Sequence, residues 1–238
     1  MEEYVKLDQI VTKLDISKGD KILVSSDVTG LLECCLEHGD TMDLNVLIDS
    51  LMDAVGEEGT LIFPTYNWGF CQGKDFDYRK TKSKTGILSQ KALDRPDFRR
   101  TKHPIYSFAV WGRDQEYLCG LDNVSAFGVD SPFVFFHKQN VKNLIISVEL
   151  ENCLTFAHYV QEVNAQYVPY RYLKNFFGNY IDEDGNISKR TYSMFVRSLS
   201  KKTGNGSSDI SNIVLKDWIE KGVVKEYNIN EVMLGSKP

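Results

Sequence analysis

Residues 21–25 read Lys-Ile-Leu-Val-Ser and residues 60–64 read Thr-Leu-Ile-Phe-Pro, two short aliphatic runs typical of buried strands. Between them, residues 43–55 repeat apolar side chains at helical spacing, and Gly56 ends that pattern. The order strand, helix, strand predicts a parallel pair of strands with the helix packed on one face. Ligand-binding loops in such sheets follow the carboxyl ends of the strands.

The alternation of helices and strands continues to about residue 163. The patterns predict helices over residues 7–14, 87–93, 131–138 and 154–163, and strands over residues 107–111 and 143–148. Further on, Asp184-Gly185 indicates a hairpin, and the sequence predicts a polar loop over residues 201–208 and an amphipathic helix over residues 210–221. We therefore expect an α/β protein with three α/β/α layers, a mostly parallel central sheet and an appended C-terminal α+β layer. A single domain over residues 1–238 is expected.

The overall composition excludes several classes of protein. A net charge of -5 argues against nucleic-acid binding, which needs a basic face. The five cysteines and four histidines show no paired ligand spacing, so no metal is expected. The N-terminus is acidic and no apolar run approaches the ~20 residues that span a bilayer, so we expect a cytoplasmic protein without membrane insertion.

Residues 65–89 are polar, aromatic and rich in lysine, and they are too many for an ordinary connection. Loops of this length inside a domain are usually functional or mobile. Aromatic side chains crowd this segment, where they would stack on sugar rings or pack the loop against the core. We interpret residues 65–89 as an active-site loop.

His158 and Glu162 are spaced i and i+4, which stacks an imidazole and a carboxylate on one helix face. A carboxylate in that position fixes the ring tautomer and supports the positive form of a general base. The same spacing is common in solvated surface pairs, so it does not establish catalysis alone.

Two other segments are candidates for binding an anion. Residues 25–30, Ser-Ser-Asp-Val-Thr-Gly, follow a strand and offer hydroxyl and backbone donors to a phosphate or an oxyanion, or else cap the next helix. Residues 99–104 gather four potential cations, a solvated edge or a phosphate site. No GxSxG occurs, so covalent serine catalysis loses support.

Several blocks, taken in order, resemble the aminoglycoside 3-N-acetyltransferase family over residues 17–175. Each block alone is weakly specific, but their joint order is hard to obtain by chance. The matching blocks are Gly19-Asp20 with Ile22-Leu23-Val24-Ser25-Ser26, Val55-Gly56 through Gly59-Thr60-Leu61-Ile62-Phe63-Pro64-Thr65, Arg100-Thr101-Lys102-His103-Pro104 with Ser107 and Gly112, Phe127-Gly128-Val129-Asp130-Ser131-Pro132, and Thr155-Phe156-Ala157-His158.

The resemblance implies an acetyl-CoA-dependent N-acetyltransferase with an α/β/α fold. His158, oriented by a carboxylate, would accept a proton from an amine that attacks the thioester directly, without an acyl-enzyme. Glu162 is the expected carboxylate. The expected cofactor-binding residues are Ser25, Ser26, Val28 and Thr29, with His103 and Ser107 nearby, and the expected substrate-binding residues are Tyr66, Asn67 and Asp130.

Three positions depart from the family's pattern. The acid usually found three residues after the histidine is replaced by Gln161, which is why the role is moved to Glu162. A glycine-rich turn is replaced by Ser147-Val148-Glu149, and Val24 stands where a histidine usually precedes the paired serines.

The acyl acceptor is either an aminoglycoside or a nucleotide-linked amino sugar of surface-glycan synthesis. Cations of the 65–89 loop outnumber its two acids, Asp75 and Asp77, which favours the second. Two other classes stay open: a member that binds CoA or a sugar without turnover, and an acyl-CoA hydrolase. The expected partners are acyl-CoA and a small amino sugar, and an exposed C-terminal layer leaves room for a homodimer.

Overall fold

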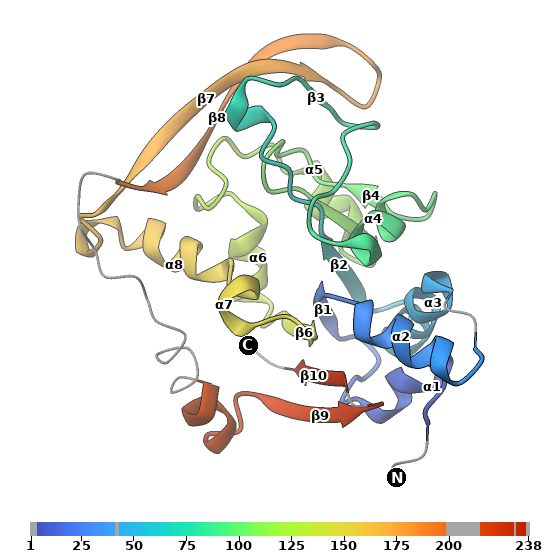
Figure 1. Ribbon diagram of the computed structural model, residues 1–238. Coiled ribbons are helices and arrows are strands. Elements are labelled where there is room, and N and C mark those ends of the chain that lie inside the picture. Colours follow the sequence, from blue (N-terminus) through green and yellow to red (C-terminus); the bar gives the residue numbers. More distant parts are fainter. Residues whose placement is uncertain (1–3, 41–42, 199–214, 231, 237–238) are drawn as a thin grey trace.

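The computed structural model describes residues 4–40, 43–198, 215–230 and 232–236. Seven of its strands form a central sheet in the order β4-β5-β2-β1-β6-β10-β9 (Figure 1). In that order the strands span Arg99–Arg100, Phe108–Gly112, Thr60–Pro64, Lys21–Ser26, Lys142–Ile146, Val232–Ser236 and Lys225–Ile229. The α/β class expected from the sequence is confirmed.

The central sheet is mixed, so the expectation of a mostly parallel sheet is wrong. β1 lies parallel to β2 and to β6, as the aliphatic runs predicted. β5 runs antiparallel to β2, with Phe108 paired to Pro64, because the intervening chain returns to the edge where β2 ends. β10 runs antiparallel to both β6 and β9.

Both faces of the sheet are buried at β1, β2 and β5, where alternate residues of each strand enter different cores. Ile22 and Val24 of β1 pack with the first core cluster, while Leu23 packs with the second. The first cluster includes residues of α1 (Leu7–Ile10), η1 (Val11–Lys13), α2 (Thr29–Glu37), α3 (Leu44–Val55) and α4 (Ile87–Leu93). The second includes residues of η2 (Phe70–Gln72), α5 (Gln115–Gly120), α6 (Pro132–Lys138) and α8 (Phe156–Val163). None of the helices in the described ranges is both long enough and apolar enough to cross a bilayer.

The C-terminal third divides between two sheets. The predicted hairpin is present as β7 (Arg171–Ile181) and β8 (Ile187–Arg197), and β3 (Phe76–Asp77) pairs with β7 to make a three-stranded sheet. The hairpin and the strands β9 and β10 lie at opposite ends of the molecule (Figure 1). β9 and β10 instead extend the central sheet, so the expected appended layer is wrong for these strands. Residues 201–208 and 210–214 lie outside the described residues, and the predicted last helix covers residues 215–220.

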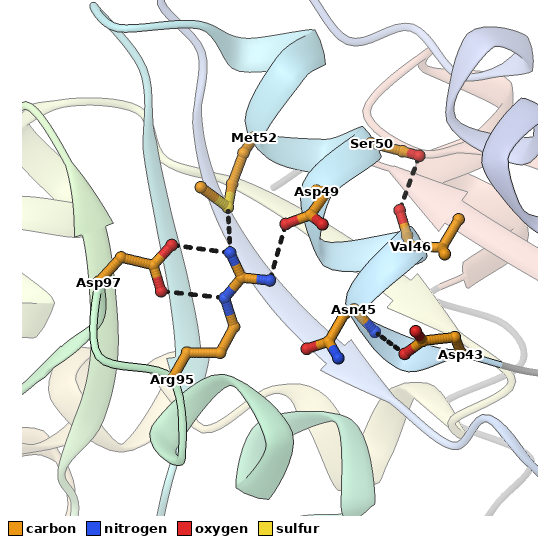
Figure 2. A network of polar contacts seen from close by, with 8 residues as sticks. All are labelled: Asp43, Asn45, Val46, Asp49, Ser50, Met52, Arg95 and Asp97. Carbon is orange, nitrogen blue, oxygen red and sulfur yellow. Dashed lines mark hydrogen bonds and ion pairs between the residues drawn. The ribbon is translucent and has the colours of Figure 1, made fainter.

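Arg95 ties α3 to the connection that leads into β4 (Figure 2). Its Nε and Nη2 donate to the two carboxylate oxygens of Asp97 at 3.0 and 2.7 Å, and Nη1 lies 2.7 Å from Asp49 Oδ1. The hydrogen bonds from Arg95 hold the pKa of Asp97 below its usual value. At the start of α3, Asp43 accepts from the Asn45 backbone N–H, a side-chain cap of the kind that aspartate commonly makes.

Candidate active site

A cavity of about 280 Å³ opens where β1 and β2 end, and it contains His158. We call it the His158 cavity. Its walls come from β1, the 65–89 loop, and the turn and helices after β6. They are formed by Leu23, Ser25, Ser26, Pro64, Tyr66, Trp68, Lys84, Thr85, Gly86, Tyr106, Val148, Asn152, Cys153, Thr155 and His158. The predicted active-site loop contributes Tyr66, Trp68 and residues 84–86.

His158 is hydrogen-bonded to Gln161 and not to Glu162. Its Nδ1 lies 3.2 Å from Gln161 Oε1. An amide oxygen can only accept, so Nδ1 carries the ring proton and the lone pair is on Nε2. Burial lowers the pKa of His158; the Gln161 hydrogen bond raises it, and the positive charge of Arg171 lowers it further. The ring is therefore a neutral base at neutral pH.

Glu162 has a different partner, which corrects its expected role. Its Oε1 accepts a hydrogen bond from Ser125 Oγ at 2.6 Å, and its Oε2 is buried without a hydrogen-bond partner. Burial raises the pKa of Glu162, and the nearby Asp130 adds to that rise. Although i and i+4 residues share a helix face, His158 hydrogen-bonds to Gln161 of its own helix and Glu162 hydrogen-bonds to Ser125 outside the helix. Asp130 is exposed and does not line the His158 cavity.

The residues at the end of β1 divide into two groups. Ser25 and Ser26 line the cavity, and Ser25 Oγ donates to Asn143 Oδ1 at 3.2 Å. Ser26 Oγ is buried without a hydrogen-bond partner. Val28 belongs to the first core cluster, and Thr29 Oγ1 donates to Asp27 Oδ1 at 2.6 Å at the start of α2. Neither Val28 nor Thr29 lines the cavity.

Aromatic rings build the wall opposite β1. The rings of Tyr66 and Tyr106 lie 4.6 Å apart, and Trp68 meets both edge-on. Burial raises the pKa of Tyr66, so its hydroxyl stays protonated. Asn67 does not line the cavity, because its side chain accepts from Gly69 N–H and donates to the Lys82 carbonyl within the loop.

The cationic run at residues 99–104 is mostly internal, so its prediction as a phosphate site is wrong for Arg100 and His103. Arg100 is 2% exposed, and its Nε donates to Ser107 Oγ at 2.9 Å. Ser107 Oγ in turn donates to the Thr65 carbonyl at 3.0 Å. His103 is 1% exposed and its Nδ1 accepts from the Tyr106 backbone N–H. His103 and Ser107 therefore do not reach the cavity to bind a cofactor.

The charge of the cavity was not readable from the sequence. Among the described lining residues none is acidic, and Lys84 is the one lysine or arginine. Lys84 lies in the lysine-rich loop without a signal of its own, Thr155 was visible only as part of the block that includes His158, and Tyr106 and Asn152 carry no recognisable signal. The described part of the chain contains no cluster of His, Cys, Asp or Glu that could hold a metal ion.

Solved structures with this fold include several aminoglycoside acetyltransferases. AAC-IIIb in a binary complex with CoASH matches with a TM-score of 0.75 at 17% identity, over 99% of this chain and 92% of that chain. AAC-VIa with bound sisomicin matches with a TM-score of 0.76 at 19% identity, over 97% and 91%. The YokD protein from Bacillus subtilis matches with a TM-score of 0.72 at 16% identity, over 97% and 86%. These TM-scores establish the shared fold, and at such low identities they establish nothing more.

Sequence comparison identifies the family directly. No curated protein sequence matches the chain, but the profile of the family described as aminoglycoside 3-N-acetyltransferase matches residues 23–229. The match covers most of the chain, including β1 with its paired serines and α8 with His158. The chain therefore belongs to the aminoglycoside 3-N-acetyltransferase family, whose enzymes are acetyl-CoA-dependent N-acetyltransferases.

Proposed function

We propose that this protein transfers an acetyl group from acetyl-CoA to the amino group of a phosphate-bearing amino sugar, such as a nucleotide-linked one, with His158 as general base. The observation that carries the choice of sugar is the charge of the His158 cavity. Lys84 lies in its wall, and none of the described lining residues is acidic. A polycationic aminoglycoside would meet no compensating carboxylate there, whereas a phosphate would pair with Lys84.

The chemistry follows from the tautomer of His158. The amine nitrogen attacks the thioester carbonyl carbon while Nε2 of His158 accepts the amine proton. The carbonyl oxygen becomes an oxyanion, for which the unpartnered Ser26 hydroxyl is a suitable donor. The C–S bond then breaks, and the imidazolium returns its proton to the departing CoA thiolate. The products are the N-acetylated sugar and CoA.

One observation favours a second candidate. Gln161 carries no negative charge to stabilise the imidazolium, which is what a family member that binds ligands without turnover would show. The variant His158→Ala distinguishes an enzyme from a binding protein. An enzyme loses about 10²–10⁴-fold in kcat with CoA binding retained, while a binding protein has no turnover to lose.

The direct test mixes the purified protein with acetyl-CoA and a panel of aminoglycosides and nucleotide-linked amino sugars, and follows CoA release together with product mass. A gain of one acetyl group on a nucleotide-linked amino sugar supports the proposal. Acetylation confined to aminoglycosides contradicts the choice of sugar. CoA release that needs no amine indicates an acyl-CoA hydrolase.

Lys84 is tested with a matched neighbour. Lys84→Met should raise the KM of the phosphate-bearing sugar at least about tenfold, because a charge-assisted hydrogen bond contributes about 1.5–3 kcal/mol. Lys82→Met is the control, because Lys82 is exposed on the same loop and does not line the cavity. If Lys84→Met raises the KM of acetyl-CoA instead, Lys84 binds a phosphate of CoA and the argument for the sugar fails.

A further inference from the structure

A second and larger cavity, of about 670 Å³, lies beside the His158 cavity. We call it the apolar cavity. Its walls are mostly hydrocarbon and include Ile145, Leu150, Leu154, Phe156, Val160 and Trp218. Among the described lining residues there is no lysine, arginine, aspartate or glutamate. Its volume falls within the range of about 300–1,000 Å³ that is usual for small-molecule sites.

The two cavities share walls. Leu23 of β1 and Cys153 of α7 (Leu150–Cys153) line both. α8 also separates them, since His158 lines one cavity and Val160 and Gln161 line the other. The apolar cavity therefore begins one layer of side chains from the base that the proposed reaction uses.

The apolar cavity does not suit the polar parts of either substrate. Its described lining holds no lysine or arginine to pair with a phosphate. The polar lining side chains are those of His137, Asn140, Asn143 and Gln161 in a mostly hydrocarbon wall, so a sugar buried there would leave many hydroxyls without a partner. The acyl group of the thioester is the part of these substrates that is apolar and must sit next to His158. A methyl group would occupy little of this volume, whereas a longer chain that extends past Leu23 and Cys153 would fill it.

We propose that the apolar cavity binds the acyl chain of the donor, so that this enzyme accepts acyl-CoA thioesters with chains longer than acetyl. The inference rests on the proposed acyl transfer, and the bonds that form and break are the same. Each methylene buried against these walls should lower the Kd of the donor about fourfold, which corresponds to about 0.8 kcal/mol per CH₂. The gain should stop when the cavity is full.

The first experiment measures donor binding without turnover. Isothermal titration of the His158→Ala protein with acetyl-, butanoyl-, hexanoyl- and octanoyl-CoA gives the Kd of each donor. Butanoyl-CoA, two methylenes longer than acetyl-CoA, should bind about tenfold more tightly or better. Equal Kd values across the series overturn the inference. They would also result if the protein itself filled the cavity, and that outcome overturns the inference as well.

The second experiment locates the effect with a matched pair of variants. Val160 and Val163 are both exposed valines of α8, 44% and 39% exposed, and of the two Val160 lines the apolar cavity. Val160→Phe should reduce the preference for octanoyl-CoA over acetyl-CoA at least fivefold, while Val163→Phe leaves that preference unchanged. Equal effects of the two variants would contradict the assignment.

Transfer assays on the unmutated protein, with the same series of donors, distinguish failure of this inference from failure of the proposed function. Transfer of every acyl group to the amino sugar with no chain-length preference in kcat/KM supports the proposed function and overturns the inference. Absence of transfer from every donor overturns the proposed function, while the titrations still report whether the cavity binds the chain.

Discussion

Gln161 Oε1 lies 3.2 Å from Nδ1 of His158, one helical turn away on α8. An uncharged carboxamide thus stands where a carboxylate was expected to orient the base. The amide fixes the same tautomer that a carboxylate would fix, because both accept from Nδ1. The amide carries no negative charge, so burial lowers the pKa of His158 more than the Gln161 hydrogen bond raises it, and that pKa lies below its ordinary value.

Gln161→Glu should therefore raise the pKa of His158, since a neighbouring carboxylate favours the charged ring. Because the neutral ring is the active form, the acid limb of the kcat/KM profile should move to higher pH by about one unit or more. The measurement is a pH series of kcat/KM for both proteins. Gln161→Met is the control, because it keeps the side-chain length without the acceptor and should lower kcat. An acid limb that does not move in the glutamate variant would show that His158 is not the titrating base.

Glu162 should tolerate replacement by its amide. In Glu162→Gln an oxygen still accepts from Ser125 Oγ, so kcat/KM should stay within about threefold of the original protein. Glu162→Ala leaves the Ser125 hydroxyl unpaired and should cost about 1–3 kcal/mol in the free energy of unfolding. Urea denaturation and kcat/KM check the two effects. A loss of more than about a hundredfold in kcat/KM for Glu162→Gln would restore the carboxylate to a catalytic role.

The elements that the sequence predicted well are those that local patterns determine. The aliphatic runs became β1 and β2, and Asp43 and Gly56 bound α3 as expected. Strand direction and pairing depend on contacts far apart in the chain. Residues 232–236 join the central sheet because Ser236 pairs with Leu144, and no local pattern indicates such a partner.

The same distinction holds for the active site. His158, Ser25, Ser26 and Tyr66, all singled out from the sequence, line one cavity because strand ends and a long loop meet at one edge of the sheet. Sequence alone could not distinguish basic side chains that line the cavity from basic side chains that are buried in the core. Lys84 belongs to the first kind, and Arg100 and His103 belong to the second.

Arg100 should prove essential for placing the 65–89 loop. Its guanidinium is buried, and burial lowers its pKa to about 10. Besides Ser107, it donates to carbonyl oxygens of that loop, namely those of Thr65, Tyr78 and Thr81. A lysine cannot make these bonds at once, so Arg100→Lys should lower the free energy of unfolding by about 3 kcal/mol. It should also raise the KM of the acceptor, because this loop supplies Tyr66 and Lys84 to the cavity.

Arg99 is the matched control for this substitution. Its side chain is 48% exposed and its ion pair with Glu183 spans 3.9 Å, so Arg99→Lys should change stability by less than about 0.5 kcal/mol. Urea denaturation and steady-state kinetics on both variants make the comparison. If the two substitutions have equal effects, the buried guanidinium does not hold the loop in place.

His103 should make the protein sensitive to acid. Burial lowers its pKa to about 3, against 6.5 for the unfolded chain. Between these values the unfolded state binds a proton that the native state does not, so stability falls as the pH falls. This single group should contribute a slope of about 1.4 kcal/mol per pH unit below pH 6. His103→Asn keeps an acceptor near the Tyr106 backbone N–H but has no proton to gain, so its unfolding free energy should lose that part of the slope. His38→Asn, at an exposed histidine, is the control and should retain the original slope. If His103→Asn also retains that slope, the buried His103 ring is not the cause of the loss of stability in acid.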